Sequence, residues 1–68
     1  MVAAVIRSFE PDQGIMRVLL VGTMSETALR VRGSDRRTIA RQPQGKPISF
    51  ELARDRYGRD CAVDVAAL

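Results

Sequence analysis

Residues 45–65, GKPISFELARDRYGRDCAVDV, predict two β-strands joined by a charged turn. Apolar residues occupy every second position on each side of that turn, the pattern of a strand with one buried face. The alternating residues are Ile48, Phe50 and Leu52, followed by Cys61, Val63 and Val65. Between them Asp55 and Gly58 bound a short polar segment, and both residue types favour the backbone conformations of turns.

Three further extended segments precede this hairpin along the chain. Residues 2–9 are rich in Val and Ile, and they stop at a turn in which Pro11 fixes φ and Gly14 accepts positive φ. Residues 14–21 and 28–32 have the composition or the alternation of strands. Short strands with Gly and Pro between them predict an all-β fold, a small five-stranded antiparallel barrel. Closure of the barrel removes the sheet edges that so short a chain could not cover.

Helix in the middle of the chain is the main alternative. Residues 36–47 are predicted to be a long basic connection, and Ser34 could cap a short helix over residues 35–41 within it. Ser25 could cap another helix that continues through Leu29. One turn of helix over residues 35–41 would leave the barrel unchanged.

The length and composition predict a single domain over residues 1–68. The apolar share of 46% and the charged share of 28% are those of an ordinary globular protein. No apolar run has the length needed to cross a bilayer, and residues 1–7 lack the features of a signal peptide. The single Cys61 has the position of a barrel residue, although an exposed thiol that links two chains is the alternative. We therefore expect a reducing, cytoplasmic setting.

The five segments together resemble a cold-shock domain. The family's first two strands follow roughly the pattern G-T-V-K-W-F-N-x-x-K-G-F-G-F-I, and residues 4–18 align to it without a gap. Residues 30–34 align to its F-V-H-F-S, and residues 45–65 resemble its last hairpin. The resemblance implies an OB-type barrel that binds single-stranded RNA or DNA. The residues matching inward positions of the barrel are Ile6, Val18, Val31, Ile48, Phe50, Ala62 and Val65.

The aromatic positions of the family's binding face are mostly changed in this chain. Ser8 replaces its Trp, Arg17 replaces one of its Phe residues, and Arg30 and Arg32 replace two residues of the third strand, whereas Phe9 is retained. Stacking of a base on an aromatic ring contributes about 1–3 kcal/mol, so losing several rings should weaken binding strongly. Arg can stack on a base and pair with a phosphate, so a charge-driven interface is predicted in place of the stacking one.

The candidate nucleic-acid-binding residues are therefore mostly basic. Between residues 30 and 41 there are five Arg residues and only one acidic residue, Asp35, an excess that an anionic polymer would encounter first. A solvated loop in an Arg-rich chain is the alternative interpretation. The predicted site consists of Arg7, Phe9, Arg17, Arg30, Arg32, Arg36 and Arg37.

A second hypothesis is a protein-interaction module that keeps the barrel and has lost nucleic-acid binding. In it Ile15 and Met16 would form an apolar patch beside Arg17 for a homodimer or for an acidic protein partner. An Sm-like or SH3-like barrel is a third possibility. The chain contains no His, and its single Cys cannot form a zinc site, so we expect no enzymatic activity, no metal and no cofactor. Tyr57 is interpreted as a turn residue or as a replacement stacking ring.

Overall fold

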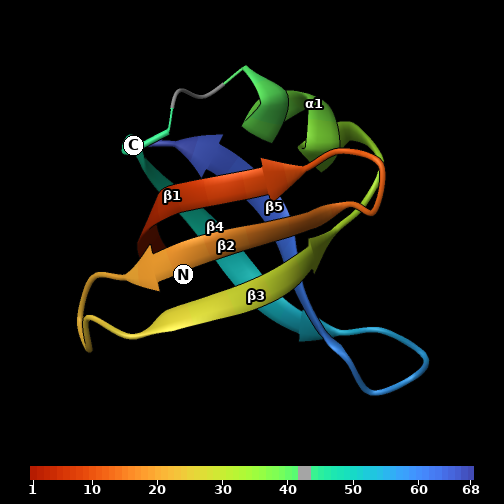
Figure 1. Ribbon diagram of the computed structural model, residues 1–68. Coiled ribbons are helices and arrows are strands. Elements are labelled where there is room, and N and C mark those ends of the chain that lie inside the picture. The colour runs from red at the N-terminus through yellow and green to blue at the C-terminus, as the bar shows by residue number, and fades with distance from the viewer. Residues whose placement is uncertain (42–43) are drawn as a thin grey trace.

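The computed structural model describes residues 1–41 and 44–68, and residues 42 and 43, which belong to the predicted connection 36–47, lie outside the described part. The described residues form five strands and one helix (Figure 1). In chain order these are β1 (Val2–Glu10), β2 (Ile15–Leu20), β3 (Glu26–Val31), α1 (Ser34–Ala40), β4 (Pro47–Arg54) and β5 (Asp60–Ala67). Every strand begins and ends within two residues of its predicted position.

The strands close into a barrel in the order β1-β2-β3-β5-β4, with β4 returning to pair with β1. The long strand β1 makes this possible, because its first half pairs with β4 and most of its length pairs with β2. The predicted all-β, five-stranded, OB-type barrel is confirmed. All neighbouring strands are antiparallel except β3 and β5, which pair in parallel through Arg30–Cys61 and Val31–Ala62. Along the chain, α1 and β4 come between β3 and β5. Strand β5 then lies beside β3 and runs in the same direction as β3.

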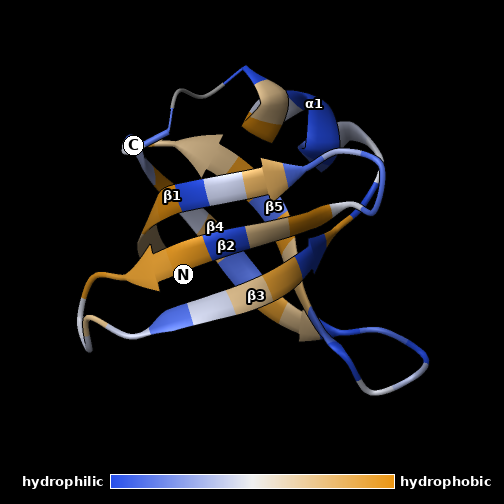
Figure 2. Ribbon diagram, in the orientation of Figure 1, coloured by the Kyte–Doolittle hydropathy of each residue, from blue (hydrophilic) through white to orange (hydrophobic). Residues whose placement is uncertain are grey.

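The barrel interior is filled by aliphatic side chains and one aromatic ring. All seven residues predicted to point inward are buried, as the alternation of strand residues requires. Figure 2 shows the result as short hydrophilic bands within otherwise hydrophobic strands. Buried hydrophobic residues beyond the predicted seven are Ala4, Met16, Leu29, Ile39 and Cys61. The predicted barrel position of Cys61 is confirmed, and its burial leaves no exposed thiol at this position.

A β-bulge in β1 decides where Phe9 points. The β1–β2 register shifts between Ile6 and Ser8, so that Ser8 faces Arg17 and Phe9 faces the buried Met16. Uninterrupted alternation from Ile6 would instead direct Ser8 inward and Phe9 outward. Phe9 is accordingly half-buried and packs against the core, so only part of the ring is accessible.

The predicted alternation of Cys61, Val63 and Val65 as buried residues fails at Val63, because β5 contains a second bulge. The β4–β5 register shifts between Ser49 and Glu51, and Asp64 in this region adopts the left-handed conformation with φ 54°. As a result Ala62 and Val65 are both buried although they are three residues apart, whereas Val63 is only partly buried. The extra residue lets the Val65 N–H donate to Asp35 Oδ1 of α1 at 3.1 Å, which fastens the helix to the barrel.

The helix α1 covers one end of the barrel, where it inserts the buried Ile39 into the core (Figure 1). Its N-cap is Gly33, and no side chain caps it, so the short helix considered for this connection is present but Ser34 is its first helical residue and not its cap. The alternative helix after Ser25 is absent, because Glu26 to Arg30 pair with β2 as a strand. No helix in residues 1–41 and 44–68 has the length and apolarity to cross a membrane.

Candidate functional site

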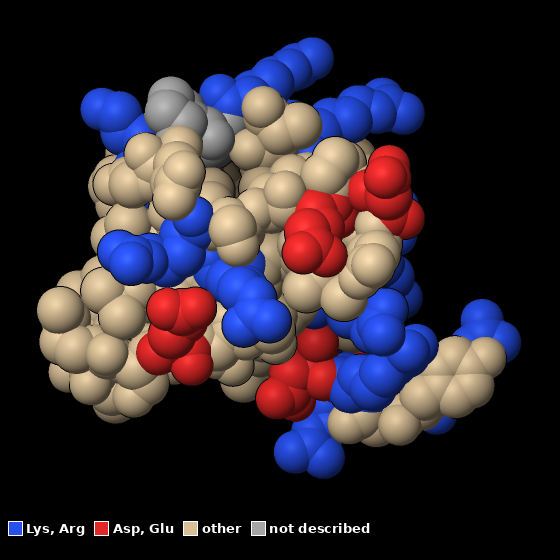
Figure 3. Space-filling view, viewed as in Figure 1, with Lys and Arg blue, Asp and Glu red and all other residues tan. Residues whose placement is uncertain are grey.

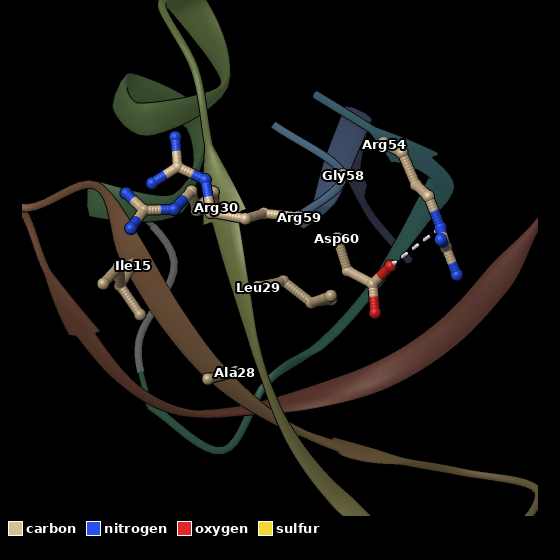
Figure 4. Close-up of a pocket in the computed structure, with 8 residues that line it drawn as sticks. All are labelled: Ile15, Ala28, Leu29, Arg30, Arg54, Gly58, Arg59 and Asp60. Atoms are coloured by element: carbon tan, nitrogen blue, oxygen red, sulfur yellow. Dashed lines mark ion pairs between the residues drawn. The ribbon is translucent and has the colours of Figure 1, made fainter. Parts of the chain in front are cut away.

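A groove of about 460 Å³ runs between strands β2 and β3 on one side and the β4–β5 hairpin on the other (Figure 4). Its walls combine an apolar surface with three Arg residues and one acid. The lining residues are Ile15, Ala28, Leu29, Arg30, Arg54, Gly58, Arg59 and Asp60. In Figure 4 the guanidinium groups of Arg30 and Arg59 lie side by side, while Arg54 and Asp60 form an ion pair of 3.6 Å at the opposite wall.

A smaller pocket of about 180 Å³ adjoins the groove and shares Arg30 and Arg59 with it. Four segments build this pocket: the β1–β2 turn, the end of β3, the first turn of α1 and the β4–β5 turn. Its charged residues are Arg30, Arg32, Arg36, Arg59 and Asp55. We call the four Arg residues of this set the arginine cluster. With four positive charges against one negative charge, this pocket attracts anions.

Arg36 is held in the cluster by the backbone around it. Its Nε donates to the Val31 carbonyl at 2.9 Å, and its guanidinium lies where the side chain of residue 14 would be if that residue were not glycine. Gly14 has φ +64°, and its carbonyl accepts a hydrogen bond from the Val31 N–H at 2.8 Å. The β1–β2 turn, the end of β3 and α1 are therefore joined at this one point.

Arg59 is held by a turn built around Asp55. One carboxylate oxygen of Asp55 accepts the backbone N–H groups of Tyr57 and Arg59, at 2.8 and 3.0 Å, and the other accepts Arg59 Nε at 2.8 Å. The Asp55 N–H and the Arg59 carbonyl close the hairpin at 2.9 Å. Tyr57 projects from this ordered turn with 72% of its surface exposed, and the Arg59 guanidinium lies 4.9 Å from its ring centre.

These hydrogen bonds lower the pKa of the Asp55 carboxyl below its ordinary value, chiefly through the Arg59 N–H, while burial acts in the opposite direction. The unfolded chain therefore binds a proton at Asp55 at higher pH than the folded chain does. The resulting stabilisation is complete above about pH 4, the usual carboxyl range, and is lost as the pH falls below it. We expect Asp55→Asn to lower the melting temperature at pH 7, with the difference from wild type shrinking below pH 4.

Thermal unfolding followed by circular dichroism between pH 7 and pH 2.5 measures this difference. The matched control is Asp60→Asn, which removes the exposed ion pair with Arg54 and should change stability little. Parallel pH profiles for wild type and Asp55→Asn would show that this carboxylate does not organise the turn.

The structure places the predicted site residues in four different surroundings. Arg30, Arg32 and Arg36 meet in the arginine cluster. Arg7 and Arg17 are exposed on the outer face of β1 and β2, where Arg17 faces Ser8 across the strands. This outer face is of mixed charge, because Glu10 and Glu26 lie on the rows of residues on either side; Figure 3 shows basic and acidic groups interspersed on it. Arg37 is exposed on α1, and Phe9 lines a shallow pocket at the β1–β2 turn.

The sequence interpretation missed Arg59 and Arg54, both on the β4–β5 hairpin. Arg59 reaches Arg30 because the parallel pairing of Arg30 with Cys61 brings the end of the hairpin turn against β3. That pairing depends on barrel closure, and no local pattern marks it. The available signal was the basic composition of the turn, in which three Arg residues fall within residues 54–59.

The predicted apolar patch of Ile15 and Met16 is wrong. Met16 is fully buried and faces the core, because side chains alternate along β2 and its neighbour Arg17 takes the outward position. Only Ile15 remains accessible, as part of the groove. Among the described residues no group of three or more His, Cys, Asp or Glu is arranged to hold a metal ion.

Comparison with known proteins assigns no family to this chain. No family model matches the sequence, and no curated protein is significantly similar to it.

Proposed function

We propose that the protein binds single-stranded RNA or DNA weakly, mainly through charge, as a cold-shock-like barrel without most of the aromatic stacking surface. In this proposal the nucleic-acid strand lies in the groove between β3 and the β4–β5 turn. The observation that carries this proposal is the convergence of Arg30 and Arg59 in one groove, where Ile15 and Ala28 supply accessible apolar surface beside them.

The two surfaces of the groove suit the two parts of a nucleotide. Guanidinium groups pair with phosphate oxygens and stack on bases, whereas the side chains of Ile15 and Ala28 offer apolar area to a base. The face of β2 and β3 and the turns beside it are where OB-type barrels bind oligonucleotides in general. The proposal thus uses the same region of the barrel with a different set of side chains.

Weak binding is expected because stacking surface is scarce. Among the residues that the structure describes, Tyr57 is the one strongly exposed aromatic, and Phe9 is half-buried. An exposed cation–π contact contributes only about 0.5–1 kcal/mol, less than the 1–3 kcal/mol of a base stacked on a ring. Most of the binding free energy then comes from counterion release, so affinity should fall steeply with salt.

A fluorescence anisotropy titration with labelled oligouridine and oligothymidine tests the proposal. We expect binding at low salt in the micromolar range. The slope of log K against log[salt] should be about −2, because single strands give about −0.7 for each phosphate neutralised and about three phosphates are contacted. Absence of binding at about a hundred micromolar protein in low salt would overturn the proposal.

Two double variants that remove the same charge locate the site. Arg30→Ala with Arg59→Ala removes the paired guanidiniums of the groove, and Arg41→Ala with Lys46→Ala removes two exposed charges away from it. We expect the first variant to lose about tenfold in affinity, because two charge-assisted contacts disappear, and the second no more than about twofold. Circular dichroism verifies that both variants remain folded. Equal losses would remove the groove as the site.

A further inference from the structure

We propose that the arginine cluster binds a terminal phosphate monoester, so that a strand in the groove is held by its phosphorylated end. This inference rests on the proposed function and adds to it the chemical class of the group that the small pocket recognises. Phosphodiester groups inside the strand would contact the groove alone.

The charge of the cluster favours a dianion. Arg30, Arg32, Arg36 and Arg59 surround the pocket, and among the described residues the only acid that lines it is Asp55. The Asp55 carboxylate already accepts three hydrogen bonds from the turn that contains Arg59. A phosphate monoester carries a charge of about −1.5 to −2 at pH 7, whereas an internal diester carries only one negative charge. The excess positive charge therefore attracts a monoester more strongly.

The hydrogen-bonding pattern prepares two guanidiniums for a ligand. Arg36 is held through its Nε by the Val31 carbonyl, and Arg59 is held through its Nε by Asp55. A guanidinium has five N–H donors, so each of these side chains is fixed by one donor and keeps its terminal NH₂ groups for an anion. Fixing the side chains before binding reduces the entropy lost when the ligand arrives.

The position of the pocket relative to the groove places the end of the strand. The pocket, of about 180 Å³, is smaller than the groove and is the part of the site where the four Arg residues gather. The groove of about 460 Å³ shares Arg30 and Arg59 with the pocket, so the attached nucleoside lies in the groove when the phosphate lies in the cluster.

The experiment compares three pentauridines that differ only at their ends, carrying a 5′-phosphate, a 3′-phosphate or hydroxyl groups at both ends. We expect one or both phosphorylated forms to bind about fivefold or more tightly than the hydroxyl form at equal ionic strength, and the preferred form identifies the bound end. Equal affinity of all three forms would overturn the inference while leaving the proposed function intact. If none of the three binds, the proposed function fails, and a titration with inorganic phosphate followed by Arg Nε–H chemical shifts still tests the pocket.

Substitutions separate the pocket from the groove. Arg36→Gln changes a residue that lines the pocket alone, and we expect it to reduce the preference for the phosphorylated end to about one. Arg54→Ala changes a residue that lines the groove alone, and it should leave that preference at its wild-type value. An unchanged preference in Arg36→Gln, with the fold verified by circular dichroism, would also overturn the inference.

Discussion

Phe50→Ala should leave the chain largely unfolded at 25 °C. Phe50 is the largest fully buried side chain, and it lies on β4, which pairs with both β1 and β5. Truncation of a buried Phe costs about 3–5 kcal/mol through lost transfer free energy and the cavity that remains. In a domain shorter than about 70–80 residues, a single core rarely supplies more than about 3–5 kcal/mol of stability. The substitution therefore removes most or all of it.

Thermal and urea unfolding followed by circular dichroism measure the free energy of unfolding that Phe50→Ala loses. Two further variants serve as comparisons. Phe50→Leu keeps most of the volume and should cost less than about 1.5 kcal/mol if the core repacks. Leu52→Ala lies two residues away on β4, is 57% exposed, and should cost well under 1 kcal/mol. A melting temperature of Phe50→Ala close to that of wild type would mean that the barrel does not close around this ring.

The positions of the core residues could be predicted from the sequence because period-two alternation is a direct consequence of strand geometry. Ile48 and Phe50 alternate with residues of the opposite face along β4, and both are buried as predicted. The positions of Phe9 and Val63 could not be predicted in this way. A bulge in β1 precedes Phe9, and a bulge in β5 lies beside Val63. A bulge inserts one residue into the pairing and reverses the face to which the later residues of the strand point, and no residue type marks it reliably.

The candidate site was predicted only in part for a related reason. Composition identified the surplus of Arg between residues 30 and 41, and three of those residues meet in the cluster. It could not identify Arg59, which is distant in sequence and comes to Arg30 only through the parallel β3–β5 pairing. Charge excess along a chain therefore indicates an anionic partner, whereas barrel closure decides which charges act together.

Gly14→Ala should lower the free energy of unfolding by about 2 kcal/mol. Gly14 adopts φ +64°, and for a residue with a Cβ the left-handed conformation costs roughly 1–2 kcal/mol. The added methyl group would also overlap the Arg36 guanidinium and displace it from the Val31 carbonyl, a hydrogen bond worth about 0.5–1.5 kcal/mol. For so small a domain a loss of 2 kcal/mol corresponds to a fall in melting temperature of about 10 °C.

A double-mutant cycle with Arg36→Ala separates the two causes. In the Arg36→Ala background there is no guanidinium to displace, so Gly14→Ala should cost only the backbone strain. The cost of Gly14→Ala should therefore be larger by about 1 kcal/mol when Arg36 is present. Equal costs in the two backgrounds would show that Arg36 moves aside freely and is not held over the turn. The Arg36 side chain also belongs to the arginine cluster. Gly14→Ala should therefore also weaken the preference for a phosphorylated strand end, and this variant should still be folded at 25 °C.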